Sequence, residues 1–177
     1  MHPQQRALST KNLAAIALFA AFYTLTVAVT GIVLPVLRGY PAHFFRGLSM
    51  SACAAFSRAR WSVSIMSFIS GLVFLAVVPA PAPYLLFSTV GAGVTYDLCM
   101  GRAYQQSVRR FGRITVGTLL SGLVEGVIAM AVLTYVGLFN VRPELLAVIW
   151  VGAIAANMVL STVGAQLTVL LLRRYRK

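Results

Sequence analysis

The chain has 177 residues, of which 59% are hydrophobic and 10% are charged, and its mean hydropathy is +0.85. Soluble domains contain about 45–50% apolar and about 25% charged residues, so this composition excludes an ordinary soluble protein and predicts an integral membrane protein. The net charge of +12 would indicate a nucleic-acid partner in a soluble protein, but the basic residues here cluster between apolar runs, as in membrane proteins, and we expect no nucleic-acid partner.

Breakers and charged residues divide the chain into six apolar spans. Pro35 ends the first span, and the sequence PAPAP at 79–83 separates the third from the fourth. The expected spans are residues 12–34, 42–57, 61–78, 84–101, 114–139 and 144–172. The first is too long for the apolar core of a signal peptide, and no signal peptide is needed to explain it. We therefore predict an all-α integral membrane bundle of six transmembrane helices, with residues 1–177 forming one domain.

The distribution of Lys and Arg predicts the orientation of these spans. Twelve of the 15 basic residues fall on one side of a six-span arrangement and three on the other. The positive-inside rule places the richer side, with both termini, in the cytoplasm, and the chain in the plasma membrane. Omitting the second span would move the basic loop SVRRFGR outside, which the charge distribution excludes. That span carries His43 and Arg46, which are costly against lipid, so one side of it must face protein or water.

The chain lacks the ligand sets of a membrane enzyme. Metal-dependent enzymes need clustered acids or histidines, whereas the three acids, Asp97, Glu125 and Glu144, are widely separated and only two histidines occur. Cys53 and Cys99 lie in or beside apolar segments without CxxC spacing, and we expect both to be buried free thiols. We expect neither catalysis nor a bound metal or other cofactor.

Glu125 lies in the middle of the apolar segment LLSGLVEGVIAM, residues 119–130. An ionisable residue at this depth is costly and suggests a function. Two interpretations stay open: a protonated or hydrogen-bonded glutamate that bridges helices to Asn157 or Ser121, or a ligand for the polar part of a substrate, with Asn157 at a similar depth. Beside it, Gly122 and Gly126 have the small-xxx-small spacing that predicts close helix approach.

The other two acids have simpler expected roles. Asp97, near the inner end of the fourth span, is expected to pair with Arg102 or another inner arginine. Glu144 follows Pro143 at the start of the sixth span, where negative charge favours a helix N-terminus, so we expect it to cap that helix.

Aromatic and polar residues are expected to gather at the outer surface. The segment PVLRGYPAHFFRG, residues 35–47, joins the first two spans with glycine and proline around its polar side chains. Such aromatics are typical of the interfacial belt of any membrane protein, but they also suit the stacking and orientation of a planar polar ligand. The residues expected to bind substrate are Arg38, Tyr40, His43, Tyr84, Phe87, Glu125, Tyr135, Trp150 and Asn157.

The pattern of spans, with a start like STKNLAAIALFAAFYTL, resembles the substrate-binding S components of energy-coupling factor (ECF) vitamin transporters. Ala17 and Ala21 match the Ala-x-x-x-Ala pattern of that family's first helix, and SRARWSVSIMSFISG resembles its basic turn and glycine-containing third helix. The resemblance covers nearly the whole chain, but as a pattern of spans. It implies capture of a vitamin or precursor near the outer surface and contact with a transmembrane coupling protein through Ala17 and Ala21. It also implies two cytoplasmic ATPases as separate subunits, in agreement with the absence of a Walker motif here.

The substrate and two competing functions remain open at this stage. The nickel and cobalt relatives begin with Met-His and carry further histidines, and although Met1 and His2 match, the following residues do not, so we reject metal as the substrate. A buried acid beside aromatics favours a thiamin-like compound, while a flavin or biotin would suit the aromatics and Arg38. The alternatives are an orphan structural or assembly protein, and an independent proton-coupled transporter that uses Glu125 as a proton relay.

Overall fold

The structure, a computed structural model, describes residues 8–33, 40–57, 59–77, 83–101, 104 and 110–174. In these residues it contains six helices: α1 (Thr10–Val33), α2 (Tyr40–Ser57), α3 (Ser62–Val77), α4 (Pro83–Met100), α6 (Phe111–Tyr135) and α7 (Pro143–Arg174). The predicted all-α fold with six helical segments is confirmed over this part of the chain. Three helices are long and apolar enough to cross a membrane, namely α1 over Thr10–Thr30, α6 and α7.

The other three helices are shorter or more polar. The apolar helix α3 has 16 residues, and α2 and α4 have 18 residues each. Because an α-helix rises 1.5 Å per residue, a helix of this length extends only about 24–27 Å, slightly less than the hydrocarbon core of a bilayer. The structure therefore supports a multi-pass membrane protein with three candidate spans.

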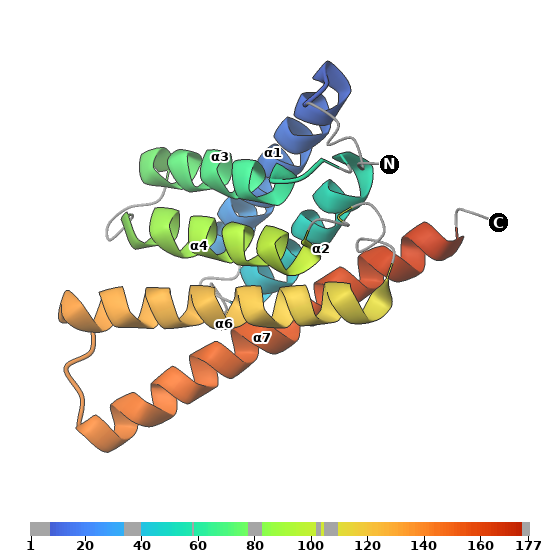
Figure 1. Cartoon of the computed structure of the whole chain (residues 1–177). Helices are drawn as coiled ribbons and strands as arrows, with labels where there is room; N and C mark the ends of the chain where they lie inside the picture. The colour runs from blue at the N-terminus through green and yellow to red at the C-terminus, as the bar shows by residue number, and fades with distance from the viewer. Residues whose placement is uncertain are drawn as a thin grey trace.

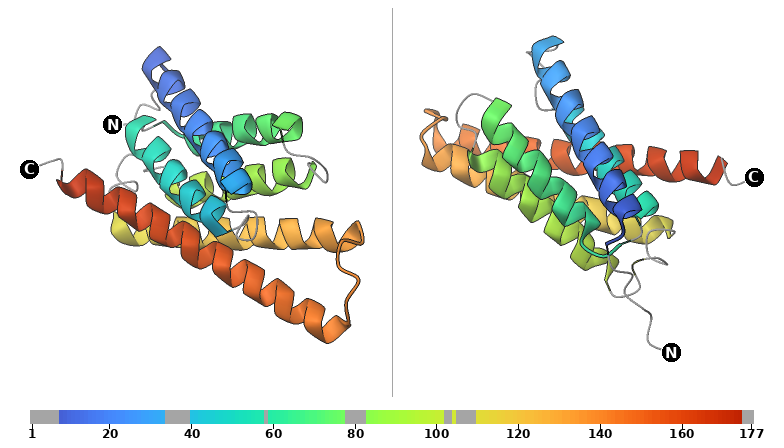
Figure 2. Two further views of the ribbon diagram at one scale, coloured as in Figure 1. Left: turned by 180° about the vertical axis from the view of Figure 1, so that it is seen from behind. Right: turned by 90° about the horizontal axis from the view of Figure 1, so that it is seen from above.

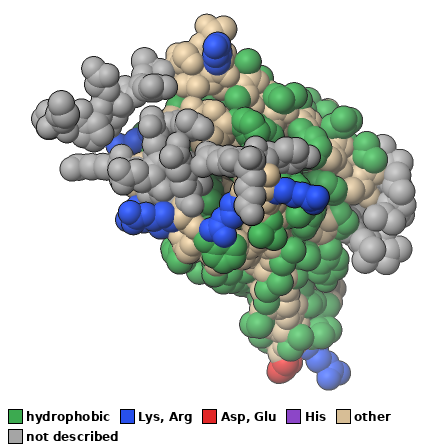
Figure 3. Space-filling view, turned by 90° about the vertical axis from the view of Figure 1, so that its right-hand side faces the viewer, with side chains coloured by type: hydrophobic (Ala, Val, Ile, Leu, Met, Phe, Trp, Pro, Cys, Tyr) green, Lys and Arg blue, Asp and Glu red, His purple; other side chains and the backbone are tan. Residues whose placement is uncertain are grey.

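The six described helices pack into one bundle, and their termini gather at its two ends. Figure 1 shows α3, α4 and α6 in a row, with α7 crossing α6, and α1 and α2 inclined across the row. The two views in Figure 2 agree, and the contacts place α6 against α4 and α7, α2 against α7, and α1 against α2 and α3. On the right of Figure 1, α3 and α6 begin where α2, α4 and α7 end. Seen from that side, Lys and Arg side chains surround this end of the bundle, and hydrophobic side chains cover its flank (Figure 3).

The main core lies between α1, α2, α3 and α4. Its fully buried members include Ile16, Met50, Val63 and Tyr96. Cys53 belongs to the same core and is 0% exposed, whereas Cys99 is only half-buried; both are free thiols. The expected small buried cysteine is thus confirmed for Cys53.

The helix boundaries differ from the prediction by up to four residues, with α6 beginning at Phe111 rather than at 114, and two of the differences have a local reason. The helix α6 ends at Tyr135 rather than at 139, because Gly137 has a φ of 74° and its N–H bonds the Thr134 carbonyl while the Leu138 N–H bonds that of Leu133. This pattern is the Schellman motif, which stops a helix at a left-handed residue. Trp61 has a φ of 68°, so α3 begins one residue later than predicted.

The predicted close approach at Gly122 and Gly126 is confirmed. A Cβ atom on Gly122 would lie 2.9 Å from the Cα of Met158, and one on Gly126 would lie 3.2 Å from the Cα of Ile154. Both contacts join α6 to α7 backbone to backbone. They flank Glu125 and hold its helix face against α7.

Candidate functional site

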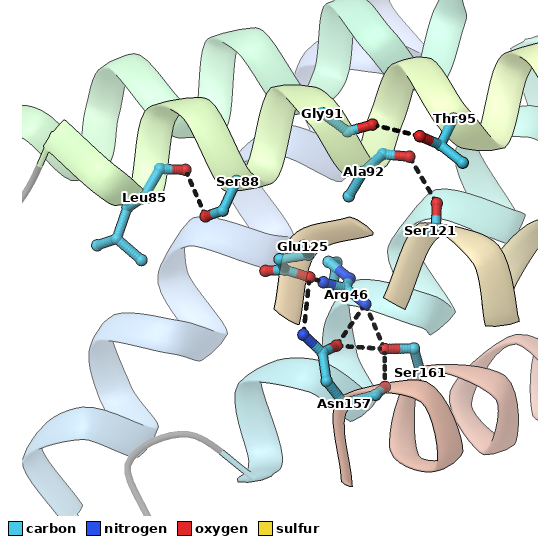
Figure 4. Close-up of polar contacts among 10 residues, drawn as sticks. All are labelled: Arg46, Leu85, Ser88, Gly91, Ala92, Thr95, Ser121, Glu125, Asn157 and Ser161. Atoms are coloured by element: carbon cyan, nitrogen blue, oxygen red, sulfur yellow. Dashed lines mark hydrogen bonds and ion pairs between the residues drawn. The ribbon is translucent and has the colours of Figure 1, made fainter. Parts of the chain in front are cut away.

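Two opposite charges buried in the bundle meet where α2, α6 and α7 converge. Arg46 on α2 forms an ion pair with Glu125 on α6. Its Nη2 atom also donates to Asn157 Oδ1 at 2.7 Å and to Ser161 Oγ at 2.5 Å, both on α7. Figure 4 shows the guanidinium enclosed by these three side chains. We call Arg46, Glu125, Asn157 and Ser161 the Arg46 cluster.

The members of the cluster also bind one another. Asn157 Nδ2 donates to Glu125 Oε2 at 3.5 Å, and Ser161 Oγ donates to the Asn157 carbonyl at 2.6 Å. Asn157 and Ser161 are four residues apart, so they lie on one face of α7. The bond between Glu125 and Asn157 is one of the two that the sequence suggested, whereas Ser121 instead donates to the Ala92 carbonyl at 2.5 Å.

A short distance between α2 and α7 places the guanidinium against α7. A Cβ atom on Gly47 would overlap the backbone of Ser161, and one on Gly164 would overlap the carbonyl of Phe44. Only hydrogen side chains allow the two backbones to lie this close. Glycine at position 47 lets α2 lie close enough to α7 for the Arg46 side chain to bond Asn157 and Ser161 directly.

The cluster is shielded from solvent and electrically balanced. Arg46 is 1% exposed, Glu125 5%, Asn157 2% and Ser161 0%. Such charges are stable in a low-dielectric interior only when they are paired and hydrogen-bonded. One donor remains: Arg46 Nε is buried and has no hydrogen-bond partner in the described part of the chain.

Aromatic and imidazole side chains lie near the cluster. The charge of Arg46 acts on Tyr23 of α1 and His43 of α2, and Tyr84 of α4 lies within electrostatic range of Tyr23. Tyr23 also packs edge-on against Phe74, with ring centroids 5.5 Å apart. The charge of Arg46 therefore reaches a hydroxyl group on α1 and an imidazole group on α2.

The structure gathers only some of the residues that the sequence suggested for substrate binding. Glu125 and Asn157 are in contact, and His43 and Tyr84 lie in the surrounding group. Three predicted residues point outward instead: Tyr40 is 53% exposed, Phe87 63% and Tyr135 91%. Trp150 Nε1 donates to Thr134 Oγ1 at 3.0 Å, which ties α7 to α6. Arg38 lies outside the described residues.

The residue that the sequence interpretation missed is Arg46. Its place in a span indicated that it must avoid lipid, but no partner was assigned to it. The sequence contained one signal for this pair. Arg46 and Glu125 are opposite charges within two apolar segments, where each needs a counter-ion.

The third acid, Asp97, caps a neighbouring helix. Its Oδ2 accepts the backbone N–H and the hydroxyl of Ser64 at 2.7 Å each, and the backbone N–H of Val63 also bonds the carboxylate. These are the orphan donors at the start of α3, where a negative charge is favourable. The arginine expected from the sequence, Arg102, lies outside the described residues.

Tyr104 completes this cap from the connection between α4 and α6. Its hydroxyl donates to Asp97 Oδ1 at 2.8 Å and lies 3.2 Å from Ser62 Oγ. Burial, reinforced by the Asp97 carboxylate, raises the pKa of Tyr104 well above its ordinary value. The phenol therefore stays protonated and remains a donor.

Replacing Asp97 by asparagine is expected to destabilise the protein by about 1–2 kcal/mol, the usual range for loss of a helix cap. The amide keeps the shape but removes the negative charge and one acceptor oxygen. Tyr104→Phe removes a single bond to the same carboxylate and is expected to cost less, about 1 kcal/mol. Thermal unfolding of the two variants in one detergent measures both effects. A larger loss for Tyr104→Phe would contradict the capping role of Asp97.

The two residues expected to contact a coupling protein lie on the surface of α1. Ala17 and Ala21 are both exposed, and Leu18 and Leu25 beside them are 65% and 64% exposed. Nothing in the described part of the chain covers this surface, so these side chains are available to lipid or to a partner helix.

Among the described residues, no three His, Cys, Asp or Glu side chains gather as metal ligands. No protein-family model matches this chain, and no curated protein and no solved structure matches it either.

Proposed function

We propose that the chain is the substrate-binding S component of an ATP-driven ECF-type importer that captures a water-soluble vitamin or vitamin precursor. The observation that carries the proposal is the Arg46 cluster, where three helices bring polar and charged side chains together and the charge of Arg46 reaches Tyr23 and His43. Ligand sites between the helices of a bundle combine a mainly apolar lining with a few polar groups of this kind. The resemblance of the span pattern to S components supports the same assignment.

The proposal includes six membrane spans with both termini in the cytoplasm. The described basic residues support it, because Lys11, Arg60, Arg110 and Arg173 lie at helix ends on one side of the bundle and Arg142 at the other side. Packing against α1, α6 and α7 would let the shorter helices α2, α3 and α4 remain in the membrane, with exposed apolar side chains such as Phe68 and Leu98 facing lipid.

The charge balance of the cluster bears on the substrate class. The expectation of a thiamin-like cation depends on a Glu125 carboxylate that has no cationic partner in the protein. Glu125 is ion-paired with Arg46, so the cluster as a whole carries no net charge and gives no preference for a cationic vitamin. We therefore keep the substrate class at a water-soluble vitamin or precursor.

The partners in this proposal are a transmembrane coupling protein and two cytoplasmic ATPases. Ala17 and Ala21 are the proposed contact with the coupling protein, because two small exposed residues one turn apart permit close helix approach. The hydrolysis of ATP would then take place on the separate subunits.

The test of this function is ligand binding by the isolated subunit. We expect native mass spectrometry of the detergent-purified chain to detect a co-purified vitamin-sized molecule, and a vitamin panel to raise its melting temperature. Tyr84→Ala, at a predicted binding residue within electrostatic range of Tyr23, should weaken binding at least tenfold, whereas Tyr135→Ala, the same change at a 91% exposed side chain, should leave it unchanged. A clean apo mass with no thermal shift for any vitamin would contradict the proposal.

A structural or assembly role is the second candidate, and one observation favours it: the cluster residues already bind one another. On that interpretation the chain takes no ligand and recruits no ATPase. An independent proton-coupled transporter differs from both, because vesicles that contain only this chain would accumulate substrate in response to a proton gradient. Uptake by vesicles and co-purification with tagged ATPases therefore separate the three functions.

A further inference from the structure

A second polar surface lies where α6 begins and α7 ends. It consists of Arg110, Phe111, Arg173 and Arg174, which are all exposed, and we call it the α6–α7 basic face. The guanidinium carbon of Arg173 lies 5.6 Å from the centroid of the Phe111 ring, within the range of a cation–π contact. The arrangement joins side chains from opposite ends of two helices, so it depends on how these helices pack.

Buried packing one turn below holds the face in place. Ile114 of α6 and Val169 of α7 belong to one small buried cluster. Phe111 precedes Ile114 by three residues and Arg173 follows Val169 by four, so each lies one turn from this contact and on the same side of its helix. The surface is therefore positioned by the core of the bundle rather than by a loop.

The positive charge of the face is not neutralised by the acids of the chain. Asp97 is 1% exposed and caps α3, and Glu125 is paired inside the bundle. Glu144 is 29 residues from Arg173 along α7, which corresponds to about 44 Å. The face thus presents uncompensated guanidinium groups, for which an anion is the complementary partner.

Apolar side chains continue the face along α7. Leu170 lies three residues before Arg173 and is 57% exposed, and Leu171 lies three residues before Arg174 and is 44% exposed. Both helices are candidate membrane spans, so cations at their ends lie at headgroup depth and the apolar residues lie at acyl-chain depth. A charged surface at the helix ends, followed by an apolar surface, is complementary to the headgroup and the acyl chains of a phospholipid.

We propose that the α6–α7 basic face binds an anionic phospholipid, with the headgroup phosphate at Arg110 and Arg173 and the acyl chains along Leu170 and Leu171. Arginine suits this role because its planar guanidinium forms paired hydrogen bonds to phosphate oxygens. Phe111 supports the Arg173 guanidinium through the ring contact. The proposal is independent of the vitamin-binding function, because it uses no residue of the Arg46 cluster.

The experiment is native mass spectrometry of the full chain titrated in a neutral detergent with phosphatidylglycerol or with phosphatidylcholine of the same acyl chains. We expect preferential retention of phosphatidylglycerol, lost as salt rises. In the variant Arg110→Gln/Arg173→Gln, the occupancy should fall roughly fivefold for each arginine removed. Arg142→Gln, the same change at an exposed arginine on the opposite end, is the control and should retain the lipid.

Three outcomes would overturn the proposal. The first is equal binding of the two lipids, and the second is an equal loss of lipid in the double variant and in Arg142→Gln. The third is unchanged lipid binding by the double variant; if that variant also loses a co-expressed subunit, the face binds an acidic protein surface instead. Thermal unfolding of each variant without added lipid should match the wild-type chain, because these are exposed side chains.

Discussion

Replacing Arg46 by methionine is expected to lower the free energy of unfolding by about 3–5 kcal/mol, the range for breaking a buried ion pair from one side. Methionine fills much of the volume of the arginine stem but provides no donor. The Glu125 carboxylate and the Asn157 Oδ1 atom would then lose their buried partner, in a site where Arg46 is 1% exposed. Unfolding of the purified chain in a single detergent, followed by temperature or denaturant, measures the loss.

Neutralising both partners should recover much of this stability. In Arg46→Met/Glu125→Met no buried charge is left unpaired, and apolar replacements of buried ion pairs are often neutral. Because single losses of about 3–5 kcal/mol would largely disappear in the double variant, the double-mutant cycle should give a coupling energy of at least about 3 kcal/mol. Arg142→Met makes the same change at an exposed arginine and should stay within about 0.5 kcal/mol of the wild-type value. Glu144→Met removes an exposed acid from the first turn of α7 and should cost about 0.3–1 kcal/mol. If the losses of stability in the two single variants simply add in the double variant, the contact between Arg46 and Glu125 contributes nothing to the free energy of unfolding.

The same double variant also distinguishes a role of the cluster in substrate binding from a purely structural role. A substrate that contacts the cluster should bind more weakly to Arg46→Met/Glu125→Met even when the protein is folded. A chain that binds its vitamin with unchanged affinity after both charges are removed uses the cluster only to hold α2, α6 and α7 together. The stability and binding measurements therefore answer different questions about one set of residues.

The sequence predicted the helices well because their signal is local. Apolar runs, prolines and basic turns recur at the spacing of helical segments, and these features determine where each helix begins and ends to within a few residues. The exceptions, at Gly137 and Trp61, depend on a backbone φ that composition does not specify. Gly122 and Gly126 were interpreted correctly because their spacing of four is itself the packing signal.

The partners of the buried charges were harder to predict because they are distant in sequence. Asp97 faces the start of α3, 33 residues before it, and Arg46 reaches Asn157 across 111 residues. Span assignment places such residues at a depth in the membrane but does not determine which helix faces which. The bond between Glu125 and Asn157 was one of two alternatives, suggested because Asn157 lies at a similar depth, whereas nothing in the sequence indicated the contact of α2 with α7.

That contact of α2 with α7 leads to the second large expected effect. Gly47→Ala should destabilise the protein by about 1–3 kcal/mol or more, because the new methyl group would overlap the Ser161 backbone and neither helix can yield by rotating a side chain. Any separation of the two helices would also lengthen the bonds from Arg46 to Asn157 and Ser161. The loss should therefore be smaller when Gly47→Ala is introduced into the Arg46→Met chain, which no longer has these bonds.

The matched control is Gly152→Ala, the same substitution within α7. A Cβ atom there would meet nothing within 4 Å, so only the backbone effect remains. Alanine is favoured over glycine in a helix interior by about 0.5–1 kcal/mol, and this variant should be as stable as the wild-type chain or slightly more stable. The opposite signs at Gly47 and Gly152 would establish that backbone contact between α2 and α7, rather than glycine content, holds the Arg46 cluster together. A stabilising Gly47→Ala would instead mean that the two helices are farther apart at this point.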